Sequence, residues 1–414
     1  MTMRVRGVWG DAHEAGFTRS SVGAYLDGLA ETGFNALFMN VKQGDGQLCW
    51  PSERFPQAVR EEYRNFDFPQ ILIEEGRKRG IEVHAWMIDF MEGENGAAYR
   101  EHPEWAMLNR EGKPTSSETL RGRRFGAIWM CPAQRPGYTD QWLVPLYVEL
   151  AERYDFASLH HDYIRYPGDL APDQYCFCDH CLAELPRWAG YLHEVHSEEP
   201  FAHDLYDRPY LEAHWEQSPR VLPGHWESLP RAFRADFLRE GSFFTGGRAD
   251  LDYFFYRYRV EQITEFARLS AEGVRAARPG TKLSGAYFKN PIHSGRFIGQ
   301  DWRAFAPWSD ICIPMDYRDH FPGTMEHYLD LLAEAIGQQK RWAAGEQALW
   351  IGFALWPLFR EESTAPYPAD KVTRTIERIA ATGVEGLVMF CSGDLERFGV
   401  KVAVRDAFGK LQGT

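Results

Sequence analysis

The segment Phe156–Cys181, FASLHHDYIRYPGDLAPDQYCFCDHC, indicates how the rest of the chain is organised. Its first half predicts a strand that ends in a charged cluster including His160, His161 and Asp162. A strand that carries a carboxylate at its carboxyl end is typical of the way barrel enzymes present catalytic groups. Three cysteines follow in Cys176–Cys181, and without a recognisable secretory signal this spacing favours a metal site over disulfides. The segment therefore predicts one chemical site and one structural site.

Outward from this segment, strand-like runs alternate with helical patterns along almost the whole chain. The eight predicted strands are Val5–Trp9, Phe34–Val41, Ile81–Asp89, Phe156–Tyr163, Lys282–Phe288, Ile311–Tyr317, Ala348–Leu355 and Gly386–Cys391. Eight strands that alternate with helices are the signature of a (β/α)8 TIM barrel, an α/β fold. We therefore expect residues 1–414 to form a single catalytic barrel.

Amphipathic patterns supply the intervening helices. The first predicted helix is capped by Ser20 or Ser21 and ends at Gly33. The others are Pro69–Arg79, Trp142–Arg153, Tyr253–Ala277, Met325–Trp342 and Ala369–Ala381, with a short helix after the last strand. The connections after the third and fourth strands are enlarged, over Phe90–Tyr138 and about 167–250, and insertions at this face of a barrel usually shape a substrate cleft.

Composition narrows the classes of partner. The formal net charge of −13 argues against nucleic acid, which requires a basic surface. No apolar run is long enough for a membrane span, and the amino-terminal MTMRVRGVWGD lacks the apolar stretch of a signal peptide. Seven cysteines, three of them clustered, fit a reducing cytoplasm. Aromatic residues make up 14% of the chain, which fits either a large aromatic core or a cleft whose rings stack on sugars.

Residues just past each strand share one rim of a barrel, and this rim is where we expect substrate. The predicted substrate contacts are Asp11, Lys42, Asp45, His84, Trp86, Asp89, His161, Arg165, Tyr287 and Trp356. Lys289 and Asp394 also follow strands and belong to the same rim. Such a set of polar and aromatic groups is typical of a carbohydrate site.

Two carboxylates of this rim are the predicted catalytic pair, because glycoside hydrolysis needs an acid and a base or nucleophile. Asp162 is the expected general acid, with Arg165 and the neighbouring histidines tuning its pKa. Asp316 is the expected partner, since the sixth strand would place it across the mouth from the fourth. The alternatives are that Asp162 only pairs with Arg165 and that Asp316 only caps the next loop.

Several motifs resemble a group of glycoside-hydrolase-like barrels: RGVWGD, VKQGDG, EVHAWM and, most specifically, the fourth-strand sequence DYIRYP at Asp162–Pro167. The likeness covers the first four strands and fades after Cys181. The resemblance implies a barrel active on an oligo- or polysaccharide, with Asp162 as the catalytic residue.

The cysteines resemble those of the family 42 β-galactosidases, in which four thiolates bind a structural zinc. The matching features are His102-Pro103-Glu104, Cys131-Pro132 and the trio Cys176, Cys178 and Cys181. The resemblance implies a zinc site made of Cys131, Cys176, Cys178 and Cys181, whose closed shell leaves no position for catalysis. His180 or Asp179 are alternative fourth ligands, and three reduced thiols without metal are the alternative to a zinc site.

The chain also departs from that family, whose enzymes use an Asn-Glu pair after the fourth strand and a glutamate at the seventh. Here the fourth strand ends in His161-Asp162 and ALWIGFAL carries no glutamate, so the two-glutamate mechanism does not carry over. Met315-Asp316-Tyr317 resembles chitinase-type barrels, which keeps substrate-assisted catalysis open. A non-catalytic carbohydrate-binding barrel and a metal-dependent hydrolase using His160, His161 and Asp162 are further alternatives. The sequence leaves the sugar, the linkage and any homo-oligomer undetermined.

Overall fold

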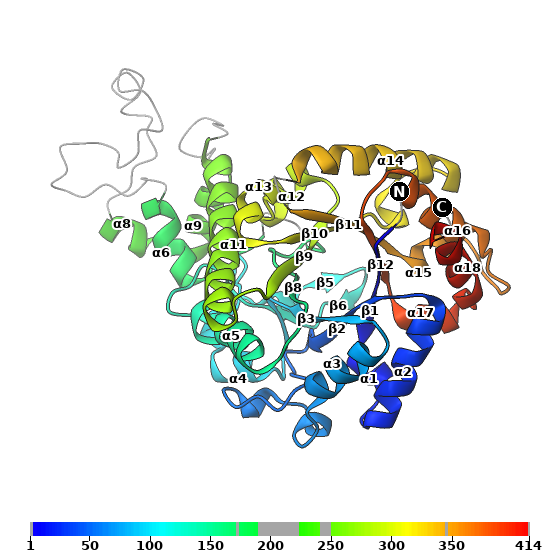
Figure 1. Ribbon diagram of the computed structural model, residues 1–414. Coiled ribbons are helices and arrows are strands. Elements are labelled where there is room, and N and C mark those ends of the chain that lie inside the picture. Colours follow the sequence, from blue (N-terminus) through cyan, green and yellow to red (C-terminus); the bar gives the residue numbers. More distant parts are fainter. Residues whose placement is uncertain (1–2, 171–173, 189–222, 241–249, 344–346, 413–414) are drawn as a thin grey trace.

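The computed structural model describes residues 3–170, 174–188, 223–240, 250–343 and 347–412. Within these ranges, eight parallel strands close a barrel in which β12 pairs back onto β1 (Figure 1). The barrel strands are β1 (Val5–Asp11), β2 (Ala36–Lys42), β3 (Glu82–Ile88), β8 (Ser158–Asp162), β9 (Lys282–Phe288), β10 (Ile311–Met315), β11 (Ala348–Ala354) and β12 (Gly386–Phe390). The predicted TIM barrel is therefore confirmed, and each predicted strand end lies within two residues of its observed position.

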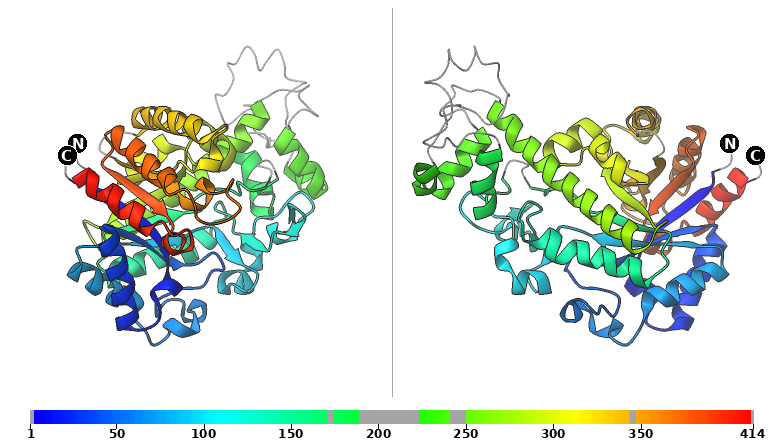
Figure 2. Two further views of the ribbon diagram at one scale, coloured as in Figure 1. Left: turned by 90° about the vertical axis from the view of Figure 1, so that its right-hand side faces the viewer. Right: turned by 60° about the vertical axis from the view of Figure 1, so that its left-hand side comes forward.

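Helices follow the strands and form an outer ring. They are α2 (Arg19–Thr32), α3 (Phe68–Lys78), α5 (Val144–Arg153), α11 (Asp250–Ala277), α12 (Pro291–Ile298), α13 (Trp302–Phe305), α14 (Met325–Trp342), α16 (Asp370–Ala381) and α18 (Lys401–Gln412). In Figure 2 the last helix, α18, lies beside α2, so the end of the chain closes the ring against its beginning. Each helix covers the outer face of the sheet with its apolar side.

The start of α2 differs from the prediction. Thr18 is the N-cap, and its side chain accepts a hydrogen bond from the backbone N–H of Ser21. Ser21 instead occupies the third helical position and completes a capping box with Thr18. The helix ends as predicted at Gly33, whose φ of 94° is a left-handed conformation that favours glycine.

The enlarged connections carry their own short elements. Between β3 and α5 the chain forms two small antiparallel sheets of two strands each. One pairs β4 (Met91–Gly93) with β7 (Ala127–Trp129), and the other pairs β5 (Thr119–Leu120) with β6 (Arg123–Arg124). After β8, the helices α6 (Asp179–Trp188), α8 (Pro223–Ser228) and α9 (Arg231–Glu240) are described, and both α6 and α9 contact α11. The rest of the enlarged connection predicted over about 167–250, residues 171–173, 189–222 and 241–249, lies outside the described residues.

Side chains on the barrel strands alternate between the lumen and the helix layer. The apolar filling of the lumen is Trp9, Phe38, Ile311, Ile313, Trp350 and Val388. Gly352 and Gly386 make room for the two tryptophans, because a Cβ would lie 3.0 Å from the Trp9 ring and 2.9 Å from the Trp350 ring. The second side of each strand packs on the helices, so neighbouring residues of one strand occupy different environments.

Candidate active site

Asp162 lies at the carboxyl end of β8, on the lumen side. Its Oδ2 accepts a hydrogen bond from Trp86 Nε1 at 3.1 Å, and its Oδ1 accepts one from the backbone N–H of Tyr163 at 2.7 Å. Tyr163 has a φ of 54°, a left-handed conformation that costs a non-glycine residue about 1 kcal/mol. Strained backbone of this kind is concentrated at functional sites, and here it directs an N–H at the carboxylate.

Burial controls the protonation of Asp162. The side chain is almost completely buried, and this desolvation raises its pKa from 3.8 to about 6. The positive charge of Arg165 and the hydrogen bonds from Tyr163 and Trp86 act in the opposite direction. A carboxyl group whose pKa approaches neutrality is suited to donate a proton.

Arg165 packs among aromatic rings close to Asp162, at the opening formed by the carboxyl ends of the barrel strands, which we call the mouth. Its guanidinium carbon lies 4.3 Å from the centroid of the Tyr163 ring, 4.9 Å from that of Phe288 and 5.4 Å from that of Trp129. The backbone N–H of Arg165 donates to the carbonyl of Tyr163 at 2.9 Å, which closes a tight turn directly after Asp162. Arg165, which the sequence analysis placed beside Asp162, and Trp86, a predicted residue of the same rim, both act on that carboxyl group in the structure.

Further aromatic residues extend this wall, and the sequence analysis did not single them out. Phe390 lies 6.2 Å from Trp86 and 6.1 Å from Tyr317, measured between ring centroids, and Tyr317 stacks on His320 at 5.4 Å. Burial, and next the charge of Asp162, raise the pKa of Tyr317. Phe288 and Phe390 end their strands on the lumen side, and this register was the signal that could have identified them.

Two histidines occupy the lumen below Asp162. His84 stacks on Phe38 with centroids 4.2 Å apart, and its Nδ1 lies 2.7 Å from Ser158 Oγ. His160 is linked to Ser284 Oγ at 2.9 Å. Desolvation lowers the pKa of His84 to about 3 and the pKa of His160 well below its ordinary value, so both rings are neutral. The predicted substrate contact His84 is thus a hydrogen-bonded core residue beneath the mouth.

The predicted catalytic partner Asp316 does not face the mouth. It follows β10 on the helix side, where Oδ1 accepts a hydrogen bond from Gln339 Nε2 of α14 at 2.8 Å. The side chain is fully buried, Oδ2 has no hydrogen-bond partner among the described residues, and desolvation raises the pKa to about 8. The prediction that Asp316 faces Asp162 across the mouth is wrong. Ile311 and Ile313 point into the lumen, so the alternation along β10 turns Asp316 toward the helices.

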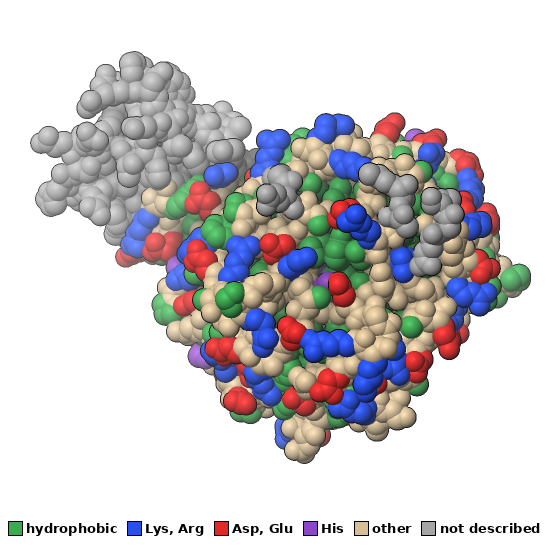
Figure 3. All heavy atoms as spheres, viewed as in Figure 1, with side chains coloured by type: hydrophobic (Ala, Val, Ile, Leu, Met, Phe, Trp, Pro, Cys, Tyr) green, Lys and Arg blue, Asp and Glu red, His purple; other side chains and the backbone are tan. Residues whose placement is uncertain are grey.

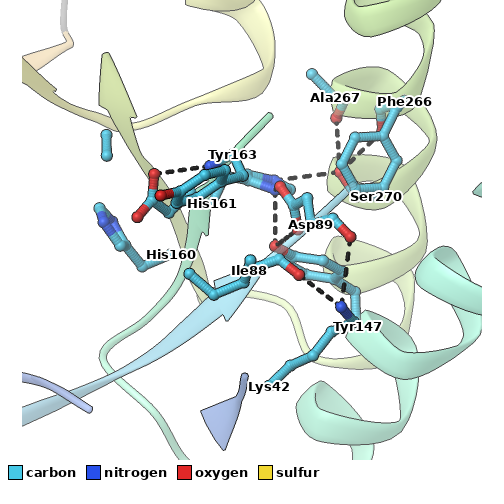
Figure 4. Close-up of polar contacts among 12 residues, drawn as sticks. Lys42, Ile88, Asp89, Tyr147, His160, His161, Tyr163, Phe266, Ala267 and Ser270 are labelled. Atoms are coloured by element: carbon cyan, nitrogen blue, oxygen red, sulfur yellow. Dashed lines mark hydrogen bonds and ion pairs between the residues drawn. The ribbon is translucent and has the colours of Figure 1, made fainter. Parts of the chain in front are cut away.

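Asp89 and His161 also lie in the helix layer, contrary to their predicted place at the rim. His161 Nδ1 lies 2.9 Å from Asp89 Oδ2, and the Tyr147 hydroxyl donates to Asp89 Oδ1 at 2.7 Å (Figure 4). On its other side, the His161 ring approaches Ser270 Oγ of α11 at 3.3 Å. These residues connect β3 and β8 to the helices α5 and α11. Because His160 and His161 point to opposite faces, the predicted metal trio of these histidines and Asp162 does not converge.

Lys42 and Tyr287 are likewise buried away from the lumen. Lys42 Nζ forms an ion pair with Glu92 Oε1 at 3.0 Å, with both side chains fully buried, and donates to the carbonyl of Ile88 at 2.6 Å. The Tyr138 hydroxyl donates to the same Glu92 oxygen at 2.5 Å. Tyr287 packs outward on α13. These two predicted substrate contacts are structural, because the bulge in β2 and the strand parity turn them outward.

Asp11, Asp45 and Trp356, three further predicted rim residues, keep exposed positions. Asp11 caps the short helix α1 (Ala12–Ala15) through the backbone N–H of His13. The Asp45 side chain accepts from the backbone N–H of Gln47 at 3.0 Å. Trp356 lies directly after β11, in the short helix α15 (Leu355–Leu358). Its side chain is 40% exposed, which is unusual for so large an apolar group. It remains a predicted sugar platform.

The four predicted metal ligands come together. Cys131, from the connection after β3, joins Cys176, Cys178 and Cys181 from the connection after β8, and their sulfurs all lie within 4.8 Å of one another. The Cys131 sulfur is 3.6 Å from that of Cys181 and 3.7 Å from that of Cys178. A tetrahedral zinc with bonds of about 2.3 Å places its sulfur ligands about 3.8 Å apart, so the set fits the metal. Among the described residues, no other group of candidate ligands is clustered in this way.

A cavity of about 720 Å³ lies at the opposite end of the barrel, around Ile81–Val83, Asp155–Ala157 and Arg278–Thr281. Its lining contains the amino ends of β3 and β9, whereas barrel enzymes carry their chemistry at the carboxyl ends. We therefore place the candidate site at the carboxyl ends of the strands, where Asp162 lies, and not at this cavity.

A comparison with known protein families gives a match over the first part of the chain. Residues 4–177 match the family described as "Glycosyl hydrolase-like 10", a range that includes Trp86, Asp162 and Arg165. No curated protein is similar in sequence to the chain. The first half of the chain thus resembles a glycoside-hydrolase-like barrel. No helix in the described ranges has the length and apolar character needed to cross a membrane.

Solved structures share the fold at low sequence identity. The cold-adapted β-galactosidase from Rahnella sp. R3 superposes with a TM-score of 0.67 at 14% identity, over 100% of this chain and 56% of that one. An α-L-fucosidase from Paenibacillus thiaminolyticus gives 0.57 at 14% identity, over 99% of this chain and 49% of that one. The β-amylase catalytic domain from Paenibacillus polymyxa gives 0.57 at 12% identity, over 98% of both chains. The chain thus spans about half the length of the first two of these proteins.

Proposed function

We propose that the protein is a glycosidase and that Asp162 is its general acid. The observation that carries this proposal is a buried carboxyl group at the end of β8, with a pKa raised to about 6, inside an aromatic mouth. The family match over residues 4–177 and the folds of the similar structures support the same class of reaction.

In the proposed reaction, protonated Asp162 donates its proton to the oxygen of the scissile glycosidic bond. The carboxylate that forms keeps its hydrogen bonds from Trp86 Nε1 and the Tyr163 N–H. These donors stabilise the anion as it develops, and the positive charge of Arg165 adds to their effect. The site is thereby arranged for charge that appears during proton transfer.

The aromatic wall is the proposed sugar-binding surface. Trp86, Tyr163, Tyr317 and Phe390 surround Asp162, and the C–H faces of pyranose rings stack favourably on such planes. The exposed Trp356 extends this surface at the end of β11.

For the second carboxylate we propose Asp319 in place of Asp316. Asp319 follows β10 and Tyr317, and its Oδ1 is buried without a hydrogen-bond partner among the described residues. The charge of Asp319 is among those that raise the pKa of Tyr317, after the larger effects of burial and of Asp162. A carboxylate on the sixth strand's loop is available for the second role in hydrolysis.

The outward position of Asp316 also favours a second candidate function, a barrel that binds carbohydrate without cleaving it. If Asp319 does not act in catalysis, the reaction requires the substrate's own acetamido group as nucleophile or does not occur. These outcomes separate in a mutational test.

The test compares Asp162→Asn, Asp319→Asn and Asp316→Asn on a broad panel of glycans. We expect the first two to abolish hydrolysis and Asp316→Asn to retain it, with all three folded by circular dichroism. An unchanged rate for Asp162→Asn on a cleaved glycan would contradict the proposal. Binding without turnover by the wild-type protein across the panel would favour the binding function. Hydrolysis that is confined to acetamido sugars and is retained by Asp319→Asn would favour substrate assistance.

We further propose that Cys131, Cys176, Cys178 and Cys181 hold a structural zinc. When bound, the ion supplies a rigid link between the connections after β3 and β8. Asp179 pairs with Arg231 instead of completing the cluster, and Cys131 provides the fourth sulfur. The seven cysteines are all free thiols, which fits the proposed reducing cytoplasm.

A further inference from the structure

Arg165 is a buried cation whose guanidinium group is only partly hydrogen-bonded. The residue is 5% exposed, and Nε and Nη1 have no hydrogen-bond partner among the described residues. The charge of Arg165 and a hydrogen bond with it lower the pKa of the Tyr163 phenol, while burial raises that pKa overall. Within the same described ranges, no carboxylate forms an ion pair with this guanidinium.

Such an arrangement is unfavourable in an isolated protein. A buried charge is stable when it is paired and when its N–H groups are hydrogen-bonded. The rings of Trp129, Tyr163 and Phe288 offset part of the desolvation through cation–π contact, but they contact the flat faces of the guanidinium. Nε and Nη1 remain buried without an acceptor among the described residues.

These two nitrogens lie in the same mouth as the proposed acid. Arg165 is the first of the groups that lower the pKa of Asp162, so its charge reaches that carboxyl group. The left-handed turn at Tyr163 holds both residues, since it supplies the N–H to Asp162 and the carbonyl to the Arg165 N–H. A ligand that contacts Asp162 is therefore within reach of Arg165.

We propose that Arg165 binds an anionic substituent, a carboxylate or a sulfate ester, on the sugar that enters the mouth. This inference rests on the proposed function and specifies its substrate class. It involves one anionic group and not a polyanion, because the chain carries a formal net charge of −13. On the face shown in Figure 3, acidic and basic side chains are interspersed, without an extended basic surface.

Binding of an anionic substituent also changes the pKa of Asp162. When the ligand's charge offsets that of Arg165, the group that most strongly lowers the pKa of Asp162 is neutralised, and this pKa rises. The other titratable groups that act on Asp162 or feel its charge are Asp89, Tyr147, Tyr163 and Tyr317, and they stay in place. Asp162 thus remains protonated to a higher pH with an anionic substrate than with a neutral one.

Binding measurements on the full chain test the inference. The probes are tetrasaccharides of glucose and of galactose, each in a neutral form, with one C6 carboxylate and with one C6 sulfate, titrated calorimetrically at constant ionic strength. We expect at least one anionic form to bind about tenfold to a hundredfold more tightly than its neutral counterpart, as expected for a charged hydrogen-bond partner. The preferred form then distinguishes a carboxylate from a sulfate.

Arg165→Met should remove this preference, while Arg165→Lys should keep part of it. Arg268→Met, on the outer side of α11, is the control for net charge and should keep the preference intact. If Arg165→Met does not fold, the preference of the wild-type protein still decides the question.

Equal affinity of neutral and anionic forms, or binding of neither, would overturn the assignment of Arg165. Hydrolysis or binding of neutral glycans would in that case leave the proposed function standing. The pH profile gives an independent readout, since the basic limb should lie at higher pH for the anionic substrate in wild-type protein and coincide for both substrates in Arg165→Met.

Discussion

His161 and Asp162 are adjacent residues at the end of one strand, yet they belong to different parts of the molecule. Asp162 faces the lumen and contacts Trp86, whereas His161 faces the helices and contacts Asp89. Both are buried and polar, so neither burial nor residue type separates them. The comparison shows that the face of the strand decides whether a charged group at the rim is available to a ligand.

The largest expected difference between the two faces is in activity. Asp162→Asn should lower kcat by about 10² to 10⁴, because general acid catalysis contributes a factor of this size. His161→Gln should leave the kcat of the folded fraction within a few-fold of wild type. Kinetics on a cleaved glycan, corrected for active fraction, measure both. A comparable loss of kcat in both variants would remove the functional distinction between the faces.

In stability, the larger loss is expected on the helix side of the strand, at His161. His161→Gln disturbs the hydrogen bonding of the buried Asp89 carboxyl group, so the free energy of unfolding should fall by about 1 to 3 kcal/mol. Urea unfolding followed by circular dichroism measures this change. The control is Glu272→Gln, which breaks an exposed pair with Arg268 and should change stability by less than about 1 kcal/mol. A His161 variant as stable as this control would contradict the structural role of the outer cluster.

The lumen face should also show its own pH dependence of stability. The pKa of Asp162 is higher in the folded protein, about 6, than its ordinary value of 3.8, so protonation favours the fold. This contribution is present below about pH 4 and is lost as pH rises through about 6. Asp162→Asn, which stays neutral, should therefore be more stable than wild type at pH 8 by an amount on the order of 3 kcal/mol.

Unfolding curves at pH 4 and pH 8 check this sign. The advantage of Asp162→Asn should shrink toward zero at the lower pH. An equal advantage at both values would show that the effect comes from packing and not from the ionised carboxylate.

The proposed zinc site links the connections after β3 and β8, and removal of its ligands should cause an intermediate loss of stability. Cys176→Ser should remove the metal, measured by mass spectrometry of the purified protein, and lower Tm. Cys312→Ser changes a buried thiol outside the cluster and should keep the full metal content. Absence of zinc from the wild-type protein prepared with added zinc would contradict the proposal.

The smallest effect is expected at the exposed edge of the mouth. Trp356→Ala should raise KM by about five- to tenfold, since one stacked ring contributes roughly 1 kcal/mol, and should leave kcat and Tm unchanged. Val402→Ala is the matched control, because this exposed apolar side chain lies on α18, away from the barrel mouth. An unchanged KM for Trp356→Ala would exclude the platform role.

The strands could be predicted because their apolar runs are bounded by helical patterns and turn residues. The site was predicted less completely, since strand period alone does not say which parity faces the lumen. Asp316 and Asp89 follow their strands on the helix side, and only the register of Ile313 or Trp86 shows this. The Lys42–Glu92 pair depends on a hairpin about fifty residues downstream of Lys42, which no local pattern indicates.

By itself, the sequence determined the barrel, the place of Asp162 at the end of the fourth strand and the four cysteines as candidate ligands. Periodicity and spacing along the chain carry that information, together with family resemblance. Only the tertiary structure decided which rim residues share the mouth, because closing the sheet sends alternate side chains to opposite faces. It also showed Arg165 held by three rings with free N–H groups, a property of packing between segments far apart in the chain.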